Sequence, residues 1–296
     1  MLTRDIQIRD PFILRHGGLY YMYGSTDGDI WGGRGTGFDV YAGRDLTEWE
    51  GPIRAFRPPD GFWGTRNFWA PEVYEYGGAF YMLASFMGDG FMRGTAVLRA
   101  ERPGGPFLPW SQGAVTPRDW MCLDGTLHID GDGRPWIIFC HEWVQTGDGT
   151  ICAARLDGEL TRAVSEPVTL FASSDAPWSR KAFSPSNNIE GYVTDGCFTH
   201  RTETGRLLML WSCMGEKGYC LGYAVSESGG VQGPWTQAER PLFAEDGGHG
   251  MIFRAYDGRL LLALHSPNRT PFERAVFIEL EETEGGLEPR RDREGL

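Results

Sequence analysis

The sequence lacks the features that mark nucleic-acid-binding and membrane proteins. Lysine is almost missing, because Lys181 and Lys217 are the only lysines among 28 basic residues. The 40 acidic residues outnumber the basic ones and give a formal net charge of −12. Such a surface repels phosphates and acidic lipids, so we expect no nucleic-acid partner and no membrane partner. A run of about 18 apolar residues, the minimum for a transmembrane helix, does not occur.

Export signals and reactive-cysteine patterns are also missing. The first residues, MLTRDIQIRDPFIL, contain neither an apolar segment of signal-peptide length nor a small-residue cleavage site. We therefore expect a cytoplasmic location. The six cysteines form no CxxC pair, and in a reducing compartment we expect free, mostly buried thiols. A G-x-S-x-G elbow is absent, and the stretch WGGRGTGF from Trp31 precedes no convincing helix, which disfavours a serine hydrolase and a phosphate loop.

The sequence does contain an internal repeat. Five segments each have two apolar runs joined by a Gly-containing turn, a pattern typical of β-hairpins. They begin near residues 9, 69, 122, 193 and 248. This spacing is close to that of a four-stranded propeller blade with its loops, and five similar units disfavour a sandwich or barrel. The sequence therefore predicts an all-β fold, a five-bladed β-propeller in which residues 1–296 form one domain.

Two details of the propeller follow from the same pattern. We expect an N-terminal strand to pair with the last blade, because this closure would leave few exposed edges. We expect the fifth blade to end near Leu280, and the charged chain after Glu281 to fray.

Acidic residues occur at the start of several repeats. Alignment of the five segments superimposes Asp10, Ala70, Asp124, Asp195 and His249. The first strand of each propeller blade lines the central channel, so these carboxylates would face one funnel, whereas Arg9 would alternate away from it. Glycoside hydrolysis uses such a set: one carboxyl protonates the leaving oxygen and another activates a water. A third carboxylate keeps the acid protonated by raising its pKa.

The motifs RDPFI, WAPEV, LDGTL, VTDG and HGM, in this order and spacing, resemble glycoside hydrolase family 43 over about residues 6–282. The resemblance implies a five-bladed propeller that cleaves arabinose- or xylose-containing glycans. It implies Asp10 as the general base and Asp124 as the modulator of the acid's pKa.

The proton donor departs from the family pattern. Most members carry Glu-Gly-Pro at this position, whereas this chain has Asp195-Gly196-Cys197. Aspartate is one methylene shorter, which sets its carboxyl back by about 1.5 Å. We take Asp195 as the first candidate for the general acid. Glu190 and Glu142 are the alternatives, and loss of activity is the remaining one.

Further residues are candidates for binding. Trp31, Trp69 and Trp143 could stack on sugar rings, while Glu72 could be either a rim charge paired with an arginine or a contact to a sugar hydroxyl. The resemblance implies that His249 faces the channel next to a bound cation, commonly calcium, which is held largely through waters. No organic cofactor is expected.

The function that these observations favour is inverting hydrolysis of short arabinose- or xylose-containing oligosaccharides, of the α-L-arabinofuranosidase or β-xylosidase type. Three long loops, 25–38, 56–68 and 171–192, could wall the site and favour exo action. A cytoplasmic enzyme would also meet short oligosaccharides. Two alternatives are another five-bladed propeller glycosidase, of the fructan or agaro-oligosaccharide type, and a non-catalytic sugar-binding propeller.

Overall fold

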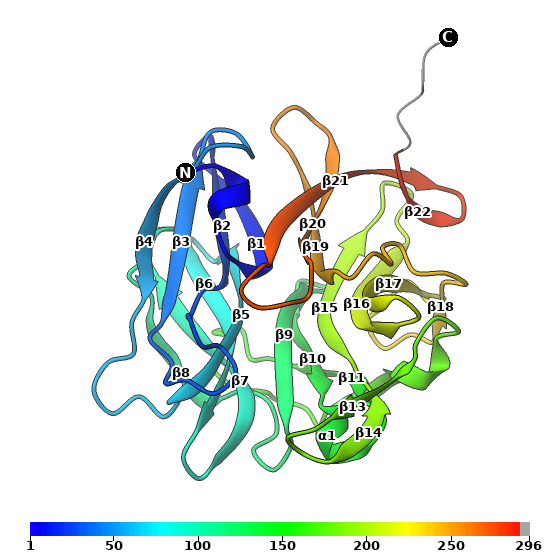
Figure 1. Cartoon of the computed structure of the whole chain (residues 1–296), viewed down its shortest axis with the longest axis horizontal. Helices are drawn as coiled ribbons and strands as arrows, with labels where there is room; N and C mark the ends of the chain where they lie inside the picture. Colours follow the sequence, from blue (N-terminus) through cyan, green and yellow to red (C-terminus); the bar gives the residue numbers. More distant parts are fainter. Residues whose placement is uncertain (291–296) are drawn as a thin grey trace.

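The computed structural model describes residues 1–290, which form five four-stranded antiparallel sheets around a central axis (Figure 1). This confirms the predicted all-β, five-bladed β-propeller. Blade 1 contains β1 (Arg9–His16), β2 (Leu19–Ser25), β3 (Phe38–Gly43) and β4 (Glu50–Phe56). Blade 2 contains β5 (Arg66–Tyr76), β6 (Ala79–Gly88), β7 (Phe91–Ala100) and β8 (Leu108–Ala114).

The remaining blades follow in chain order, each starting close to its predicted residue. Blade 3 contains β9 (Cys122–Ile129), β10 (Pro135–His141), β11 (Thr150–Arg155) and β12 (Val168–Ala172). Blade 4 contains β15 (Asp195–Arg201), β16 (Leu207–Gly215), β17 (Gly218–Ser226) and β18 (Trp235–Gln237). Blade 5 contains β19 (Gly248–Arg254), β20 (Leu260–Ser266), β21 (Arg274–Thr283) and β22 (Gly286–Pro289). Outside the blades lie α1 (Trp143–Thr146), η1 (Thr3–Asp5), η2 (Ser173–Asp175) and a hairpin of β13 (Lys181–Ser184) and β14 (Ile189–Tyr192).

The closure of the ring differs from the prediction. Blade 5 takes all four strands from the end of the chain, because Gly286–Pro289 forms β22 where fraying was expected; residues 291–296, to which the same expectation applied, lie outside the described residues. The N-terminal segment pairs within blade 1 instead, where Leu2 bridges to Glu48. Blades 1 and 5 meet through packing of β1 on β19, through side-chain contacts and through a backbone–backbone hydrogen bond from the Ile8 N–H to the Glu273 carbonyl at 3.3 Å. With β22 present, the last blade needs no N-terminal strand.

Much of the hydrophobic core lies between neighbouring blades. Phe38 and Phe56 of blade 1 pack against Phe68 and Phe86 next to them, and all four rings are buried. The rings of Phe68 and Phe86 meet edge-on with centroids 4.8 Å apart, a favourable arrangement for aromatic pairs. Such packing holds one blade against the next, and thereby sets how the inner strands converge.

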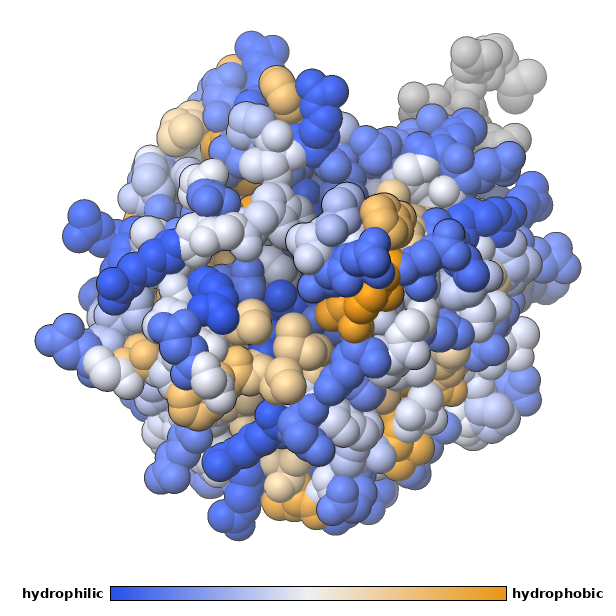
Figure 2. Space-filling model, turned by 60° about the horizontal axis from the view of Figure 1, so that its bottom comes forward, coloured by the Kyte–Doolittle hydropathy of each residue, from blue (hydrophilic) through white to orange (hydrophobic). Residues whose placement is uncertain are grey.

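Three further observations concern composition. All six cysteines are free and buried, as expected. Among the described residues, no helix has the length and hydrophobicity needed to cross a bilayer. The face drawn in Figure 2 is hydrophilic over most of its area, with its hydrophobic residues gathered in patches.

Candidate active site

A β-bulge recurs at the start of the first strand of every blade. Pairing of β1 with β2, for example, passes from Arg9 opposite Ser25 to Phe12 opposite Tyr23. The corresponding strands of the other four blades show the same irregularity. At each bulge one residue has φ between 49° and 56°: Asp10, Ala70, Asp124, Gly196 and His249. Non-glycine residues persist in this region only where their surroundings hold them there.

The bulges correct the predicted alignment in blade 4. Asp10, Ala70, Asp124 and His249 are equivalent as predicted, but the fifth equivalent residue is Gly196 rather than Asp195. Glycine suits this place because a Cβ on Gly196 would lie 2.7 Å from the His249 ring. Asp195 therefore occupies the preceding position, which is that of Arg9 in blade 1. The bulge also interrupts strand alternation, so Arg9 does not point away as expected and instead lines the cavity.

Side chains of one blade hold the bulges of the next. In four blades the bulge N–H donates to a side chain on the second strand of the preceding blade: Ala70 to Ser25 Oγ (2.9 Å), Asp124 to Ser85 Oγ (2.8 Å), His249 to Ser212 Oγ (2.8 Å) and Asp10 to His265 Nδ1 (3.1 Å). Blade 3 has Cys140 near the corresponding position. The Gly196 N–H donates to Asp124 Oδ2 instead, at 2.8 Å. Contacts between blades thus hold the bulge residues in their positive-φ conformation.

The bulges surround a cavity of about 310 Å³. Eight of the ten predicted site residues line it: Asp10, Asp124, Glu142, Asp195, Trp31, Trp69, Trp143 and His249. The other two lie elsewhere. Glu190 is exposed on β14, where it pairs with Lys181 at 3.2 Å, and Phe183 of the same hairpin reaches the cavity in its place.

Glu72 is buried away from the cavity, so it is neither at the rim nor placed to contact a sugar there, the two alternatives expected for it. It accepts a hydrogen bond from the Tyr74 hydroxyl, which also lies 2.7 Å from Thr126 Oγ1, and it does not line the cavity. The reason is its place two residues beyond the bulge, farther into the ring. Burial raises the pKa of Glu72 to about 8, and the nearby Asp124 charge adds to this rise against the hydrogen bonds from Tyr74 and Thr126.

Asp10 is held as a carboxylate. Burial by itself would raise its pKa, but the His249 imidazole and the Arg9 guanidinium lie close by, and the Ser25 hydroxyl donates to Oδ2 at 2.6 Å. These contacts, together with His265, lower the pKa of Asp10 to about 2. Asp10 is therefore ionised throughout the neutral range.

The other two aspartates are shifted in the opposite direction. Burial raises the pKa of Asp124 to about 8, with the Asp10 charge adding to the effect. Burial also raises the pKa of Asp195 to about 7, assisted by the Asp124 charge and opposed by His249. The site thus combines one ionised carboxylate with two carboxyls that hold protons near neutral pH, the separation that acid–base catalysis requires.

Several residues in or beside the cavity were not found by sequence reasoning. The Tyr219 hydroxyl donates to Asp195 Oδ2 at 3.2 Å, and Asn268 also lines the cavity. Arg93 lies over the Trp69 ring at 4.2 Å and forms an ion pair with Glu142. None of these residues belongs to a first-strand motif. A search for polar residues near the starts of third strands could have found Tyr219 and Arg93.

The imidazole of His249 lies between two aspartates. Its Nδ1 is 3.2 Å from Asp10 Oδ1 and 3.6 Å from Asp124 Oδ2. An ionised Asp10 can only accept, so Nδ1 carries the proton and Nε2 is left as a single donor atom for a cation. Among residues 1–290 there is no group of three His, Cys, Asp or Glu side chains placed to hold a metal ion. The residues would therefore fit only a cation whose other ligands are largely waters.

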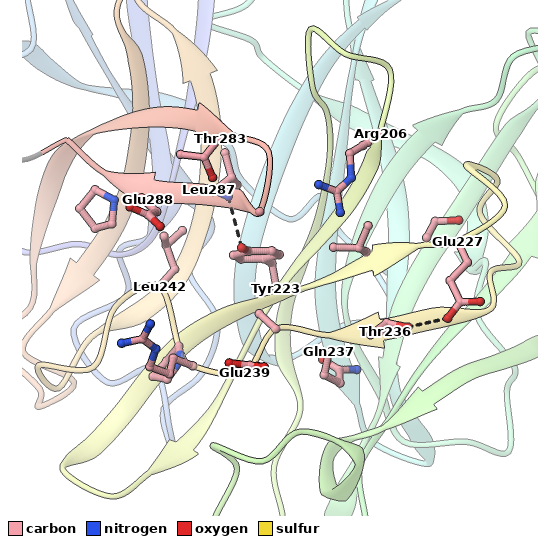
Figure 3. A pocket seen from close by; sticks show the side chains of 17 residues that line it. Arg206, Tyr223, Glu227, Thr236, Gln237, Glu239, Leu242, Thr283, Leu287 and Glu288 are labelled. Atoms are coloured by element: carbon pink, nitrogen blue, oxygen red, sulfur yellow. Dashed lines mark hydrogen bonds between the residues drawn. The ribbon is translucent and has the colours of Figure 1, made fainter.

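A larger cavity, of about 970 Å³, lies between blades 4 and 5 (Figure 3). Its acidic residues Glu227, Glu239 and Glu288 are exposed. Tyr223 accepts a hydrogen bond there from the Leu287 N–H at 3.2 Å, and Thr236 donates to Glu227 at 2.6 Å. These contacts connect strands and turns. The cavity contains no buried, convergent carboxylates of the kind described above.

Carboxyls with opposed pKa shifts, set among tryptophans at the inner end of a propeller, define a glycosidase site. The sequence profile of glycosyl hydrolases family 43 matches residues 5–285. The chain therefore belongs to glycoside hydrolase family 43.

Relatives of this chain include enzymes that act on arabinan. An endo-arabinase structure from Bacteroides thetaiotaomicron VPI-5482 is 39% identical, with a TM-score of 0.90 over 97% of this chain and 98% of the other. The extracellular exo-α-(1→5)-L-arabinofuranosidase ArbA of Cellvibrio japonicus is 25% identical over 54% of this chain and 46% of its own length. The extracellular endo-α-(1→5)-L-arabinanase 1 of Bacillus subtilis is 25% identical over 46% of this chain and 44% of its own. The matches thus span less than half the length of these two relatives.

Proposed function

We propose that the chain is an inverting, exo-acting hydrolase of α-1,5-linked L-arabinofuranosyl oligosaccharides. The observation that carries the chemistry is the contrast between Asp10, whose pKa is lowered to about 2, and Asp195, whose pKa is raised to about 7, in one cavity. The choice of arabinose is supported by the arabinan-cleaving relatives. Membership of glycoside hydrolase family 43 disfavours the alternative of a fructan- or agaro-oligosaccharide-cleaving propeller from another family.

Asp10 acts as the general base in this proposal. Its carboxylate would take a proton from a water as that water attacks the anomeric carbon. Ser25 and His249 hold the carboxylate in place at 2.6 Å and 3.2 Å. The His265 Nδ1 accepts a hydrogen bond from the Asp10 backbone N–H. The backbone of Asp10 at the bulge is therefore held in place as well as its side chain.

Asp195 acts as the general acid. It would donate its proton to the glycosidic oxygen as the bond breaks, so that one proton enters the leaving group and one leaves the attacking water. Asp124 disfavours the ionisation of Asp195, because two buried carboxyls so close together resist carrying two negative charges, and its Oδ2 accepts the Gly196 N–H of the next blade at 2.8 Å. Glu142 is a weaker candidate, because its carboxylate is already paired with Arg93.

The walls of the cavity support exo action. The Trp31 Nε1 donates to the Thr270 hydroxyl at 3.3 Å, which connects a loop of blade 1 with a loop of blade 5 along one side of the cavity. Arg9 strengthens this connection, since it lies 5.0 Å from the Trp31 ring centroid and pairs with Glu273 at 2.9 Å. Trp69 would stack on a sugar ring, because Arg93 and a hydrogen bond to the Ile30 carbonyl at 2.6 Å hold its indole rigidly.

The test is proton NMR of the purified chain with a panel of arabino-, xylo- and fructo-oligosaccharides, combined with chromatography of the products. The proposal expects release of arabinose with inverted anomeric configuration and no intermediate-length products. A ladder of intermediate lengths would establish endo action, which the 39% identical endo-arabinase favours as the second candidate. Line broadening without any release would indicate the non-catalytic sugar-binding propeller.

Short oligosaccharides as substrates and a cytoplasmic location remain part of the proposal, as does a hydrated calcium ion beside His249. Held there, such a cation would add fixed positive charge near the carboxylates. Cell fractionation tests the location.

A further inference from the structure

A second groove lies on the same face of the propeller as the carboxylate cavity. The first strands begin at the cavity, so in the antiparallel sheet of blade 2 the start of β7 and the end of β8 also lie at that face. These two ends and the loop before β5 enclose a space of about 420 Å³, which we call the distal groove. Its lining includes Phe62, Trp63, Phe91, Met92, Gln112 and Arg118.

The distal groove combines apolar side chains with hydrogen-bonding groups. Phe91 and Met92 are 56% and 44% exposed, and the Phe91 ring lies edge-on to Trp63 with centroids 5.9 Å apart. Adjacent exposed apolar residues of this size mark a binding surface more often than isolated ones do. Sugars present C–H faces that stack on aromatic rings and hydroxyls that pair with amides and guanidinium groups. Gln112 and Arg118 supply such groups.

Arg93 connects the distal groove to the carboxylate cavity. It lines the groove, while its guanidinium lies over Trp69 at 4.2 Å and pairs with Glu142. Trp69 and Glu142 both line the cavity. Arg93 therefore lies between the two hollows, and a ligand long enough to leave the cavity past Arg93 would meet the groove.

We propose that the distal groove binds sugar units of the same glycan chain, away from the bond that is cleaved. The inference rests on the proposed function, because it takes the ligand to be an arabino-oligosaccharide with one end in the carboxylate cavity. Continuity through Arg93 and the shared face favour this occupant over a separate partner. The groove would make the enzyme prefer longer substrates.

The experiment compares kcat/KM for a six-unit and a two-unit α-1,5-arabino-oligosaccharide. Phe91→Ala and Trp63→Ala are expected to lower the six-to-two ratio about tenfold, equivalent to about 1.4 kcal/mol. Leu108→Ala is the matched control, because Leu108 is 61% exposed at the opposite end of β8. It is expected to leave the ratio unchanged. Phe91 is a surface residue, so its variant remains informative if the Trp63 variant folds poorly.

A second readout places Phe91→Ala and its control Leu108→Ala in an Asp10→Asn background. Binding of the six-unit oligosaccharide, measured by calorimetry, is expected to weaken about tenfold in Phe91→Ala and not in Leu108→Ala. An unchanged ratio and unchanged binding in Phe91→Ala, with a wild-type chain that cleaves both substrates, would overturn the distal groove alone. A wild-type chain that cleaves neither substrate would overturn the proposed function and the groove with it.

Discussion

The Tyr219 hydroxyl donates a hydrogen bond to Asp195 Oδ2 at 3.2 Å, from a strand that sequence reasoning did not connect with the site. Tyr219 is buried and stacks on His265, with ring centroids 5.7 Å apart. His265 in turn accepts the backbone N–H of Asp10. One tyrosine therefore links the proposed acid to the support of the proposed base.

Tyr219→Phe is expected to move the pH dependence of activity. Burial raises the pKa of Asp195, and the Tyr219 hydrogen bond partly opposes that rise by stabilising the ionised form. Wild-type kcat/KM should therefore fall above about pH 7, and its alkaline limb should move to higher pH in Tyr219→Phe. Rates measured from pH 4 to 9 test this. A lower rate with the same limb would mean that Tyr219 has only a structural role.

Asp10→Asn should reduce turnover about 10³-fold on every substrate, because an amide cannot accept the proton of the attacking water. Initial rates on oligosaccharides and on aryl arabinofuranosides measure the loss. Circular dichroism of the same sample controls for folding. A variant that keeps more than a tenth of the wild-type rate would remove Asp10 from the role of base.

Asp195→Asn should reduce activity most on substrates with poor leaving groups. An acidic phenol departs without protonation, so aryl glycosides of that kind should be spared. The measurement is a series of aryl arabinofuranosides of graded phenol acidity. Equal losses across the series would mean that Asp195 is not the proton donor, and Glu142→Gln would then be tested in the same way.

Glu72 should make the folded state sensitive to pH. Its pKa is about 8 in the folded chain, mainly because of burial, against a usual value of 4.5. The protonated form is thus favoured by folding, so its stabilising effect is complete below about pH 4.5 and is lost as the pH rises through 8. Glu72→Gln removes this loss. Its free energy of unfolding relative to wild type should rise by roughly a few kcal/mol between pH 4.5 and 8.

Urea denaturation of both proteins at the two pH values gives this comparison. The pH dependence of the remaining groups is common to both proteins and cancels in the difference. The same difference at both pH values would contradict the burial of Glu72 as a neutral acid.

Calcium is expected to raise the melting temperature of chelator-treated protein, because an ion that binds only the folded state stabilises it. His249→Ala should lose this response, since Nε2 of His249 is the donor atom available in the channel. Differential scanning calorimetry with and without calcium tests both statements. An identical melting temperature in the wild-type protein under both conditions would argue against a bound cation.

The repeat in the sequence was sufficient to predict the architecture. Hairpin patterns recur in a local stretch of chain, and each blade is one such stretch, so the starts of β1, β9 and β19 were found at the correct residue. The closure of the ring was not found. It depends on whether Gly286–Pro289 completes the last sheet or whether the N-terminal segment does, and both possibilities are compatible with the sequence.

For the site, too, some features followed from the sequence and others only from the tertiary structure. The sequence by itself determined which carboxylates enter the ring, because Asp10 and Asp124 belong to local motifs at the start of first strands. Only the tertiary structure decided how each acid is buried and paired. The bulge that shifts Asp195 by one position, the buried place of Glu72 and the contacts of Tyr219 and Arg93 come from neighbouring blades. A pKa depends on burial and on charges brought close by folding, and neither can be read from residues that are distant in the chain.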